Sequence, residues 1–255
     1  MISARAILVA TLLALPTLAH AQRGRAAGPP QSPREAAAID LTGYWVSVVF
    51  EDWKYRMVTP RKGVFDTLAL NAEGRRVGEQ WDPARDEAAG EQCRAYGAAN
   101  VMRLPGRIHV TWQDASTLRI ETDAGTQTRL FRFPSTGSGQ ADATPAGEAS
   151  WQGQSTARWV YGPPARGSAT RSGSLKVITT NLRPGYVRRN GAPYSEKATV
   201  TEYYDLNTAP NGDQWMTVTT RVDDPVYFRA PYITSTDFKK LPDAAGWNPT
   251  ACTAR

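Results

Sequence analysis

The sequence predicts an all-β protein, in which an antiparallel β-barrel of lipocalin-like shape carries one small helical insertion. Three observations support this prediction. β-Branched and aromatic residues recur in short runs, apolar and polar residues alternate within these runs, and most connections are short and rich in turn-forming residues. About eight to nine strands at this spacing, without helices between them, are typical of a barrel or a sandwich. A β-sandwich without an internal cavity is therefore the alternative.

The chain begins with the pattern of a secretory signal peptide over residues 1–21. Arg5 precedes an apolar run over residues 6–18, and Ala19 and Ala21 provide a small-residue cleavage site. A bilayer span needs ~20 apolar residues, and this run is shorter, as is every other apolar run in the chain. We therefore expect a freely soluble protein that is exported, to the periplasm or secreted, without a membrane span.

After cleavage, the chain is expected to form a tether and a single domain. Residues 22–38 are rich in Gly, Pro, Ala and Arg with almost no large apolar side chain, which predicts a flexible tether. The barrel domain spans residues 39–255. Its first strand starts in the aromatic and β-branched run at residues 44–50 and is predicted to continue toward Met57. Residues 71–99 carry Ala, Glu, Arg and Gln instead, after an initial asparagine that can cap a helix, and predict two or three short helices.

Beyond this insertion the hydrophobic period becomes two, as in strands. In residues 107–112, the isoleucine, valine and tryptophan share one face, whereas His109 lies on the other. The runs 117–123 and 126–133 extend this strand into an antiparallel meander. Later runs predict the remaining strands, and a low-complexity stretch predicts a flexible loop. The loop covers residues 134–149, and the strands cover residues 157–161, 173–182, 198–205, 214–222 and 233–239.

Charge and residue counts weaken several classes of function. The chain has 30 basic and 24 acidic residues, and in the predicted meander the arginines alternate with acidic residues rather than form one basic face. Nucleic-acid binding is therefore not expected. Cleavage of the signal peptide removes His20, so His109 is the one imidazole of the mature chain. With this single histidine, and without the common zinc, calcium, nucleotide or serine-hydrolase motifs, the sequence predicts no metal and no cofactor.

The mature chain has two cysteines, Cys93 and Cys252. An even pair in an exported protein is most often joined, so we expect a disulfide that ties the C-terminal tail to the segment around Cys93. Closing such a long loop contributes about 4 to 5 kcal/mol in the chain-entropy model. A catalytic thiol is the alternative, and its usual partner would have to be His109.

The polar face of the meander is the first candidate site. It combines His109 on one strand with Glu121 and Asp123 on the next, and Arg129 follows on the third. If this face points into the barrel, His109 would act as general acid or base, a carboxylate would orient it, and Arg129 would stabilise an oxyanion. The alternative is that this face meets water, as one face of an antiparallel sheet commonly does.

A group of tyrosine, arginine and glutamate residues is the second candidate site. Arg183 and Tyr186 lie in a turn with Gly and Pro, and Glu202 and Tyr203 lie in the following strand. Tyrosine offers a flat surface and a hydroxyl, and arginine pairs with carboxylates, so these residues could line a ligand-binding rim. Tyr186 or Tyr203 could also donate a proton. Structural packing of tyrosines at strand ends is the alternative.

Five longer motifs are specific enough for a comparison: GEQCRAYG at residues 90–97, IETDAGTQTR at 120–129, TTNLRPGY at 179–186, TEYYD at 201–205 and WNPT at 247–250. Together they resemble a family of uncharacterised exported bacterial proteins of β-rich type, found in acidobacteria and proteobacteria. The resemblance covers most of the chain from Leu41 to Cys252. It implies membership of that family and brings no known activity.

Two hypotheses of function follow from these observations. The first is an exported binding module, a barrel that holds a small hydrophobic or aromatic molecule. The second is a cofactor-independent lyase, isomerase or hydrolase that acts on such a molecule through His109. The place where His109 points distinguishes them, because a general acid or base has to face a concave pocket.

Overall fold

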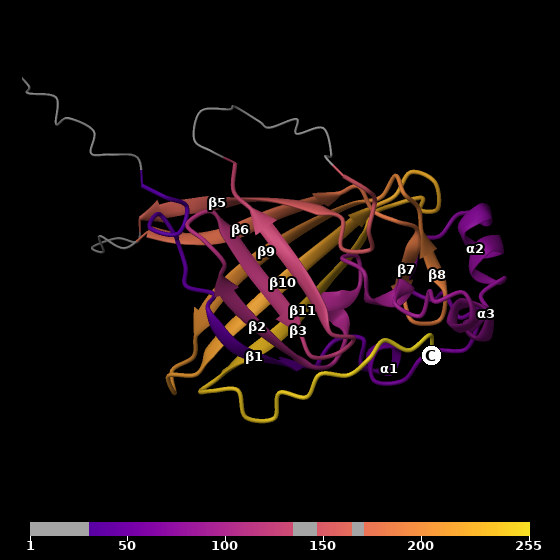
Figure 1. Ribbon diagram of the computed structural model, residues 1–255, viewed down its shortest axis with the longest axis horizontal. Coiled ribbons are helices and arrows are strands. Elements are labelled where there is room, and N and C mark those ends of the chain that lie inside the picture. The colour runs from indigo at the N-terminus through magenta and orange to yellow at the C-terminus, as the bar shows by residue number, and fades with distance from the viewer. Residues whose placement is uncertain (1–30, 135–146, 165–170) are drawn as a thin grey trace, which may run out of the picture. The chain divides into compact units, whose positions relative to one another are not determined.

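The computed structural model describes residues 31–134, 147–164 and 171–255, which belong to one compact unit (Figure 1). Within these residues, nine strands close into a barrel in the order β1-β11-β10-β9-β6-β5-β4-β3-β2. The predicted closed barrel is therefore confirmed, and the sandwich alternative is wrong. The barrel strands are β1 (Gly43–Val48), β2 (Arg107–Trp112), β3 (Thr117–Thr122), β4 (Gln127–Arg132), β5 (Gln154–Pro164), β6 (Arg171–Thr180), β9 (Thr199–Thr208), β10 (Gln214–Asp223) and β11 (Tyr232–Leu241).

Neighbouring barrel strands are antiparallel except for β4 and β5. The predicted meander is confirmed, because β2 pairs with β3 and β3 with β4 in antiparallel register. By contrast, β4 and β5 run parallel, with Phe131 opposite Ser155. Parallel neighbours need a long connection that returns the chain to the same end of the sheet, and 21 residues separate the end of β4 from the start of β5. The barrel is thus mixed rather than purely antiparallel.

The first strand ends at Val48 and does not continue toward Met57 as predicted. Asp52 adopts a left-handed backbone conformation with φ of 49° and precedes a single helical turn, α1 (Trp53–Arg56). A β-strand does not pass through this conformation. The chain therefore leaves the barrel wall after β1 and turns across one end of the barrel.

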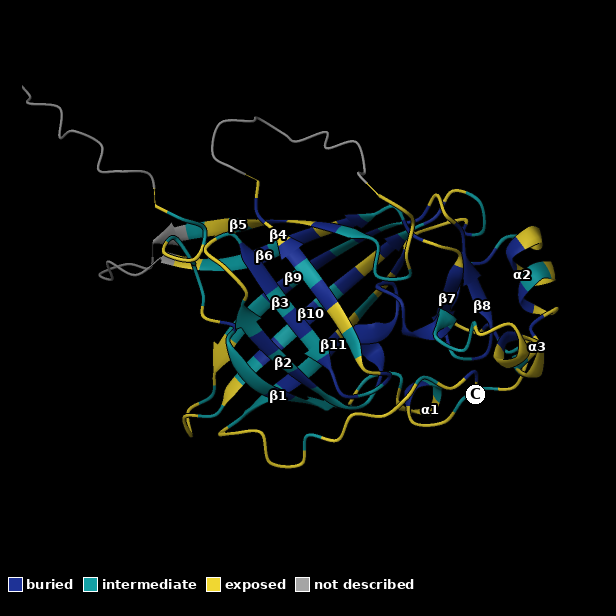
Figure 2. Cartoon of the chain, in the orientation of Figure 1, coloured by how far each residue is buried: buried dark blue, intermediate teal, exposed yellow. Residues whose placement is uncertain are grey.

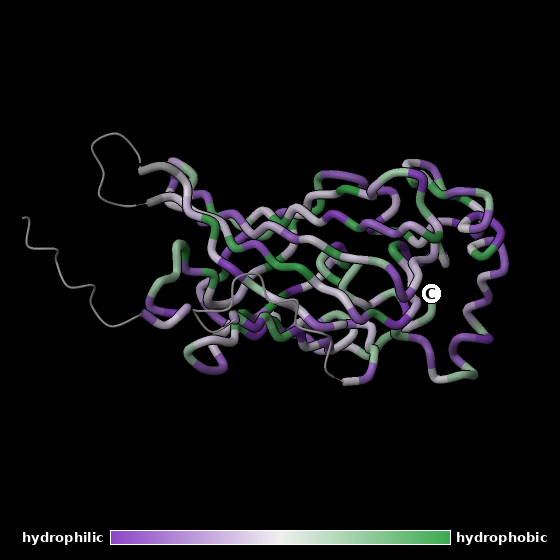
Figure 3. The backbone as a smooth tube through the Cα atoms, turned by 90° about the horizontal axis from the view of Figure 1, so that it is seen from above, coloured by the Kyte–Doolittle hydropathy of each residue, from purple (hydrophilic) through white to green (hydrophobic). Residues whose placement is uncertain are grey.

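Apolar side chains fill the interior of the barrel. Along the barrel strands, buried residues alternate with half-buried or exposed ones (Figure 2), and hydrophobic segments alternate with hydrophilic ones (Figure 3). Trp45, Phe131 and Phe238 are at most 1 % exposed and pack in one core cluster with Val101 and Met102, which enter from one end. Small barrels are commonly filled in this way. Among the described residues, the middle of the barrel is therefore a packed core rather than a ligand chamber.

A cap of short helices and a two-stranded sheet covers one end of the barrel (Figure 1). We define the cap as residues 53–103 and 185–194. Its apolar residues pack against Val200 and Tyr232 at the ends of barrel strands. Besides α1, the cap contains α2 (Ala72–Gly78), α3 (Pro83–Ala88), the 3₁₀-helices η1 (Arg94–Tyr96) and η2 (Val101–Arg103), β7 (Gly185–Arg188) and β8 (Ala192–Tyr194).

The two α-helices α2 and α3 begin with side-chain caps that the sequence could encode. Asn71 Oδ1 accepts a hydrogen bond from Gly74 N at 2.8 Å, and Asp82 Oδ1 accepts one from Ala84 N at 3.0 Å. Pro83 occupies the first helical position of α3, where its missing N–H would have no partner. The predicted helical insertion is confirmed.

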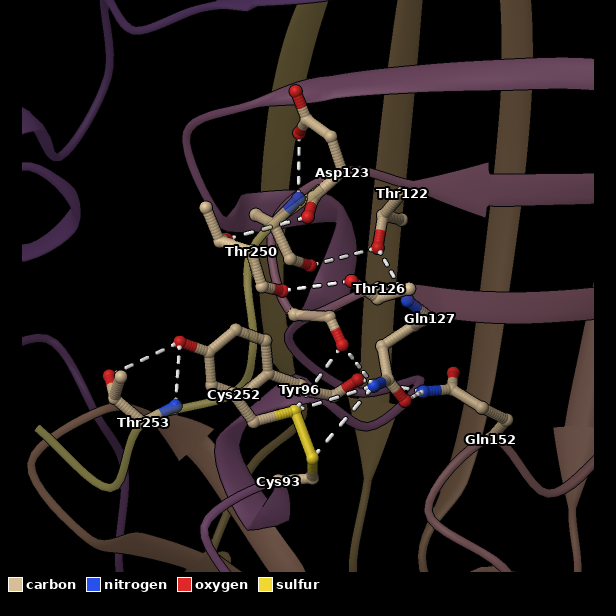
Figure 4. The surroundings of a disulfide bond; sticks show 12 residues. Cys93, Tyr96, Thr122, Asp123, Thr126, Gln127, Gln152, Thr250, Cys252 and Thr253 are labelled. Atoms are coloured by element: carbon tan, nitrogen blue, oxygen red, sulfur yellow. Dashed lines mark hydrogen bonds between the residues drawn. A yellow bond between two sulfur atoms is a disulfide. The ribbon is translucent and has the colours of Figure 1, made fainter. Parts of the chain in front are cut away.

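Cys93 and Cys252 form the predicted disulfide, which joins the cap to the C-terminal tail (Figure 4). Beside it, Thr250 N donates to Asp123 O at 2.8 Å, and Thr126 Oγ1 donates to Thr250 O at 2.9 Å. The tail is therefore fixed by one covalent bond and by the turn between β3 and β4.

Part of the predicted tether packs on the other end of the barrel. Trp159 Nε1 donates to Pro33 O at 2.8 Å, and Tyr161 OH donates to Ala36 O at 2.6 Å. This differs from the predicted flexible tether, because hydrogen-bond donors on β5 hold residues 31–38 in place. The rest of the tether, the predicted signal peptide and most of the predicted loop at 134–149 lie outside the described residues.

Candidate functional site

The His109 group lies on the outer wall of the barrel, not inside it. Residues next to His109 on β2 point inward, and His109 itself is opposite Glu121 on β3, with 3.7 Å between His109 Nδ1 and Glu121 Oε2. The imidazole stacks on Tyr44 at 4.0 Å between ring centroids and meets the edge of Trp247. Arg119 binds the same carboxylate at 2.6 Å. The imidazole therefore packs against Tyr44, with Trp247 beside the stacked pair, and faces no interior pocket.

Asp123 and Arg129 do not join His109. Asp123 is buried, and its Oδ1 accepts hydrogen bonds from the backbone N–H groups of Arg107 and Ala124, each at 2.7 Å. This carboxylate therefore stabilises the turn after β3. Arg129 points into the barrel, where it is 1 % exposed. The four residues of the first candidate site thus occupy three separate environments.

Inside the barrel, Arg129 on β4 pairs with Glu202 on β9. Two hydrogen bonds join them, Nη1 to Oε1 at 2.8 Å and Nη2 to Oε2 at 2.6 Å, and Tyr204 OH donates to Glu202 Oε1 at 3.2 Å. Burial desolvates Arg129 and lowers its pKa, but Glu202 outweighs this effect and raises the pKa above its usual value. Because both side chains are inaccessible, the pair connects two strands rather than offering a site.

The second candidate site is also divided. Tyr186 is buried in the cap and donates to Asp86 Oδ2 at 2.8 Å; burial and this hydrogen bond raise its pKa. Arg183 is exposed and pairs with Glu91 at 3.0 Å. Tyr203 lies on the outer wall beneath Lys176. Tyr186 does line a cavity of about 80 Å³ in the cap, together with Trp81, Arg85, Arg94, Tyr194 and Tyr227.

A different group of residues forms a third candidate site, which is rich in arginine. Four arginines line one cavity of about 10 Å³ in the cap, namely Arg56, Arg103, Arg188 and Arg189. This cavity has room for about one water-sized group. These residues come from α1, η2, β7 and the turn after β7. Tyr55, Asn100 and Leu104 complete the lining. We call this site the arginine pocket.

Two carboxylates accompany the four guanidinium groups. Arg56 binds Glu51 and also donates through Nε to Arg103 O at 2.9 Å, and Arg103 Nη2 donates to Asp52 Oδ2 at 3.0 Å. Desolvation by burial holds the pKa of Arg56 below its usual value; Glu51 opposes this effect, and the Arg103 charge adds to it. The described part of the pocket therefore holds two more cations than carboxylates.

The other two arginines bind neutral groups. Arg188 donates to Asp66 O at 3.1 Å and to Thr67 Oγ1 at 2.9 Å, and its guanidinium lies over the Tyr55 ring at 4.3 Å. Arg189 donates to Thr253 Oγ1 at 3.2 Å. Neither arginine forms an ion pair in the described ranges, so their charges are not neutralised locally.

Several donors of the arginine pocket have no hydrogen-bond partner. Arg56 Nη2, Arg103 Nη1 and Arg189 Nε are buried atoms without an acceptor in the described structure. Arg56 and Arg103 are 6 % and 4 % exposed, so water reaches them poorly. Because a buried N–H group without an acceptor costs about 1 to 3 kcal/mol, and more when it is charged, these groups favour a negatively charged acceptor.

Two residues with a left-handed backbone conformation lie next to the arginine pocket. Four non-glycine residues with positive φ occur in the described ranges, and Asp52 (φ 49°) and Thr67 (φ 68°) are two of them. A β-branched residue is particularly unfavourable in this conformation. Each of the two gives a side-chain oxygen to a pocket arginine, Asp52 to Arg103 and Thr67 to Arg188. Such strain is often found where a binding site fixes its groups.

The sequence prediction missed the arginine pocket. Its arginines sit in three segments that are far apart in the chain and have no shared pattern. One local signal was present, the pair Arg188 and Arg189 immediately before the turn at Asn190 and Gly191. Turn residues place neighbouring side chains close to other segments, but the partners of this pair depend on how the cap packs.

The geometry defines a closed β-barrel with an arginine-lined pocket in its cap. A scan against protein-family models, a search of curated proteins and a search of solved structures found no match to this chain. The resemblance to exported bacterial proteins therefore remains a prediction. In the part of the chain that the structure describes, no group of three or more histidine, cysteine, aspartate or glutamate residues could hold a metal ion. The same residues contain no helix with the length and apolar character of a membrane span.

Proposed function

We propose that the protein is an exported binding protein that holds the oxyanion group of a small molecule in its arginine pocket. One observation carries the proposal: guanidinium donors that are buried and find no acceptor in the described part of the chain surround a cavity, in a cluster with more cations than carboxylates. Planar guanidinium groups suit carboxylate and phosphate oxygens. The cavity has room for about one oxygen of the oxyanion, so the remainder of the ligand would lie outside, against Tyr55 or Leu104.

Export is part of this proposal. It is supported by the signal-peptide pattern at residues 1–21 and by the disulfide between Cys93 and Cys252, because disulfides persist mainly in oxidising compartments. In such a compartment the protein would encounter small metabolites. Binding them would require no cofactor.

The proposal alters the expected ligand and its place. A purely hydrophobic ligand inside the barrel has little support, since the described interior is packed with side chains. An aromatic molecule with a carboxylate or phosphate group fits better. The catalytic hypothesis has less support, because His109 is stacked on Tyr44 on the outer wall of the barrel.

Thermal unfolding of the mature protein with inorganic phosphate or benzoate tests the proposal. A ligand that binds the folded state stabilises it by about 2.7 kcal/mol at a concentration of 100 times its Kd. We expect a rising Tm with one or both probes, and loss of this rise in Arg189→Gln and Arg56→Lys. Arg189 is the better variant because its side chain makes a single hydrogen bond in the described structure, to Thr253, which is replaceable.

Arg183→Gln is the matched control, since Arg183 is an exposed arginine near the cap that does not line the pocket. It should keep the full response to the probes. An equal loss in Arg183→Gln and Arg189→Gln would show a general charge effect, and a wild-type Tm that neither probe moves would reject the proposal.

A further inference from the structure

The segment after β1 exposes four large apolar side chains. The exposed fraction is 66 % for Phe50, 63 % for Trp53, 60 % for Met57 and 64 % for Val58. We call residues 50–58 the apolar loop. Other exposed large apolar residues of the described chain belong to separate strands, β5, β6 and β11. Scattered apolar residues on a surface are ordinary, whereas a contiguous group indicates a contact surface.

The helical turn α1 orders these side chains. Trp53 and Met57 are four residues apart, so both project from one side of the turn. Arg56 on the same turn is buried and lines the arginine pocket. The polarity of this segment is thus the reverse of an ordinary surface helix, because Arg56 faces the protein and Trp53 faces water.

The acidic residues of the apolar loop are turned inward. Glu51 binds Arg56, and Asp52 binds Arg103. Both arginine side chains are at most 5 % exposed, against about 30 % for the two acidic side chains. The negative charges of the loop are therefore neutralised on its protein side.

The cations around the loop are turned outward. Lys54, Arg61 and Lys62 are exposed, and none of them forms an ion pair within the described ranges. Lys54 lies 4.8 Å from the centre of the Tyr55 ring. The surface that faces water consequently combines large apolar side chains with unpaired positive charge.

We propose that the apolar loop binds the surface of an anionic lipid bilayer. Tryptophan and phenylalanine side chains enter the boundary between headgroups and acyl chains, and lysine and arginine side chains near them attract anionic headgroups. An acidic protein surface would complement the cations, but it would give no reason for four apolar side chains to extend into water. The inference stands on exposure and charge, and it does not depend on whether the arginine pocket binds an oxyanion.

Co-sedimentation with lipid vesicles tests this proposal. The mature protein is mixed with vesicles of phosphatidylcholine alone or of equal parts phosphatidylcholine and phosphatidylglycerol. We expect binding to the anionic vesicles, weaker binding to the neutral ones, and a decrease with added salt. Trp53→Ala with Met57→Ser should weaken binding to anionic vesicles by about tenfold or more, since two apolar side chains no longer enter the bilayer.

Two further variants separate the apolar and electrostatic contributions. Lys54→Gln with Lys62→Gln should lower binding to anionic vesicles and leave the weak binding to neutral vesicles unchanged. Ile178→Ser is the matched control, because Ile178 is an exposed apolar residue on β6, 39 % exposed and outside the loop. All substituted side chains are exposed, so thermal unfolding should confirm that each variant folds.

Three results would overturn the proposal. The first is no binding of the wild-type protein to anionic vesicles. The second is an equal loss of binding in Ile178→Ser and in the Trp53 and Met57 variant. The third is binding to polyglutamate that depends on Lys54 and Lys62, with no binding to vesicles, which would assign the loop to an acidic protein partner.

Discussion

Among the described residues, buried arginines occur in two regions, and their surroundings differ. In the barrel, Arg129 faces Glu202 through two hydrogen bonds, one cation for one carboxylate. In the cap, the arginine pocket combines four cations with two carboxylates around a cavity. The barrel arginine is thus neutralised in place, whereas the cap retains positive charge.

The comparison shows which observation indicates a binding site. Within the described residues, Arg129 Nε also lacks a hydrogen-bond partner, as do Arg56 Nη2 and Arg103 Nη1. A single unpaired donor is therefore not diagnostic. The excess of cations and the adjoining cavity are what separate the arginine pocket from the ion pair in the barrel.

The largest expected effect is in the barrel. Glu202→Gln leaves the Arg129 charge buried and without its carboxylate, and breaking a buried pair in this way costs about 3 to 5 kcal/mol. Urea unfolding of the variant measures this loss. The double variant Arg129→Met with Glu202→Leu removes both charges and should return to within about 1 kcal/mol of the wild type. A double variant as unstable as Glu202→Gln would mean that the polar atoms themselves, and not their charge balance, stabilise the barrel.

Removal of the disulfide should have the next largest effect, and it should act mainly on the cap and tail. Cys93→Ser with Cys252→Ser is expected to lower the free energy of unfolding by about 2 to 4 kcal/mol. Hydrogen exchange adds the location: Thr250 N and Thr253 N should exchange faster, because the tail loses its covalent attachment. The amides between β9 and β10 should keep their protection under native conditions. Faster exchange throughout the barrel would contradict this separation of the two regions.

Much of the fold could be predicted from local sequence patterns. Alternation of apolar and polar residues located the barrel strands, and capping residues located the helical insertion. Counting cysteines identified the disulfide. Each of these signals is contained in a short segment or in residue type alone, so no knowledge of the packing was needed. The parallel pair β4 and β5 was missed because register between distant strands has no such local signal.

The sites were harder to predict, because they depend on which way a side chain points. In β4 the inward residues are Gln127, Arg129 and Phe131, and the outward ones include Leu130. Polar and apolar residues occur on both faces of this strand, so its pattern could not reveal that Arg129 enters the barrel. Glu202 lies on the same face of β9 as Val200 and Tyr204. The alternation along this strand could therefore have predicted that Glu202 points into the barrel. The arginine pocket had no comparable signal, since packing of the cap creates it.

A moderate effect is expected for buried tyrosines at high pH. Burial raises the pKa of Tyr194, so the folded protein keeps this phenol proton at a pH where the unfolded chain, with a pKa of about 10, loses it. The resulting stability is complete below pH 10 and decreases above it, by up to about 1.4 kcal/mol per pH unit. Tyr194→Phe removes this contribution. Above pH 10, its free energy of unfolding should therefore fall less steeply than that of the wild type, by up to about 1.4 kcal/mol per pH unit. At pH 8 it should change little, because Tyr194 OH has no hydrogen-bond partner in the described structure.

Tyr186→Phe is the matched comparison for this experiment. It also removes a buried phenol, but it breaks the hydrogen bond to Asp86, so it should already destabilise the protein at pH 8 by about 1 kcal/mol. If both variants behave alike at pH 8, the hydrogen bond between Tyr186 and Asp86 contributes nothing to stability.

The smallest effect is expected for the arginine pocket without ligand, and it is the most direct contrast with the barrel. Arg189→Gln should leave the free energy of unfolding within about 0.5 kcal/mol of the wild type, because it removes one unpaired cation from a cluster with excess positive charge. Arg94→Gln is the control: Arg94 is also a cap arginine, but it pairs with Asp86 and Glu91 at 3.1 and 3.2 Å. Its loss should cost about 1 to 2 kcal/mol. If Arg189→Gln were as destabilising as Arg94→Gln, the pocket arginines would stabilise the fold as Arg129 does, and the argument for a ligand would lose its basis.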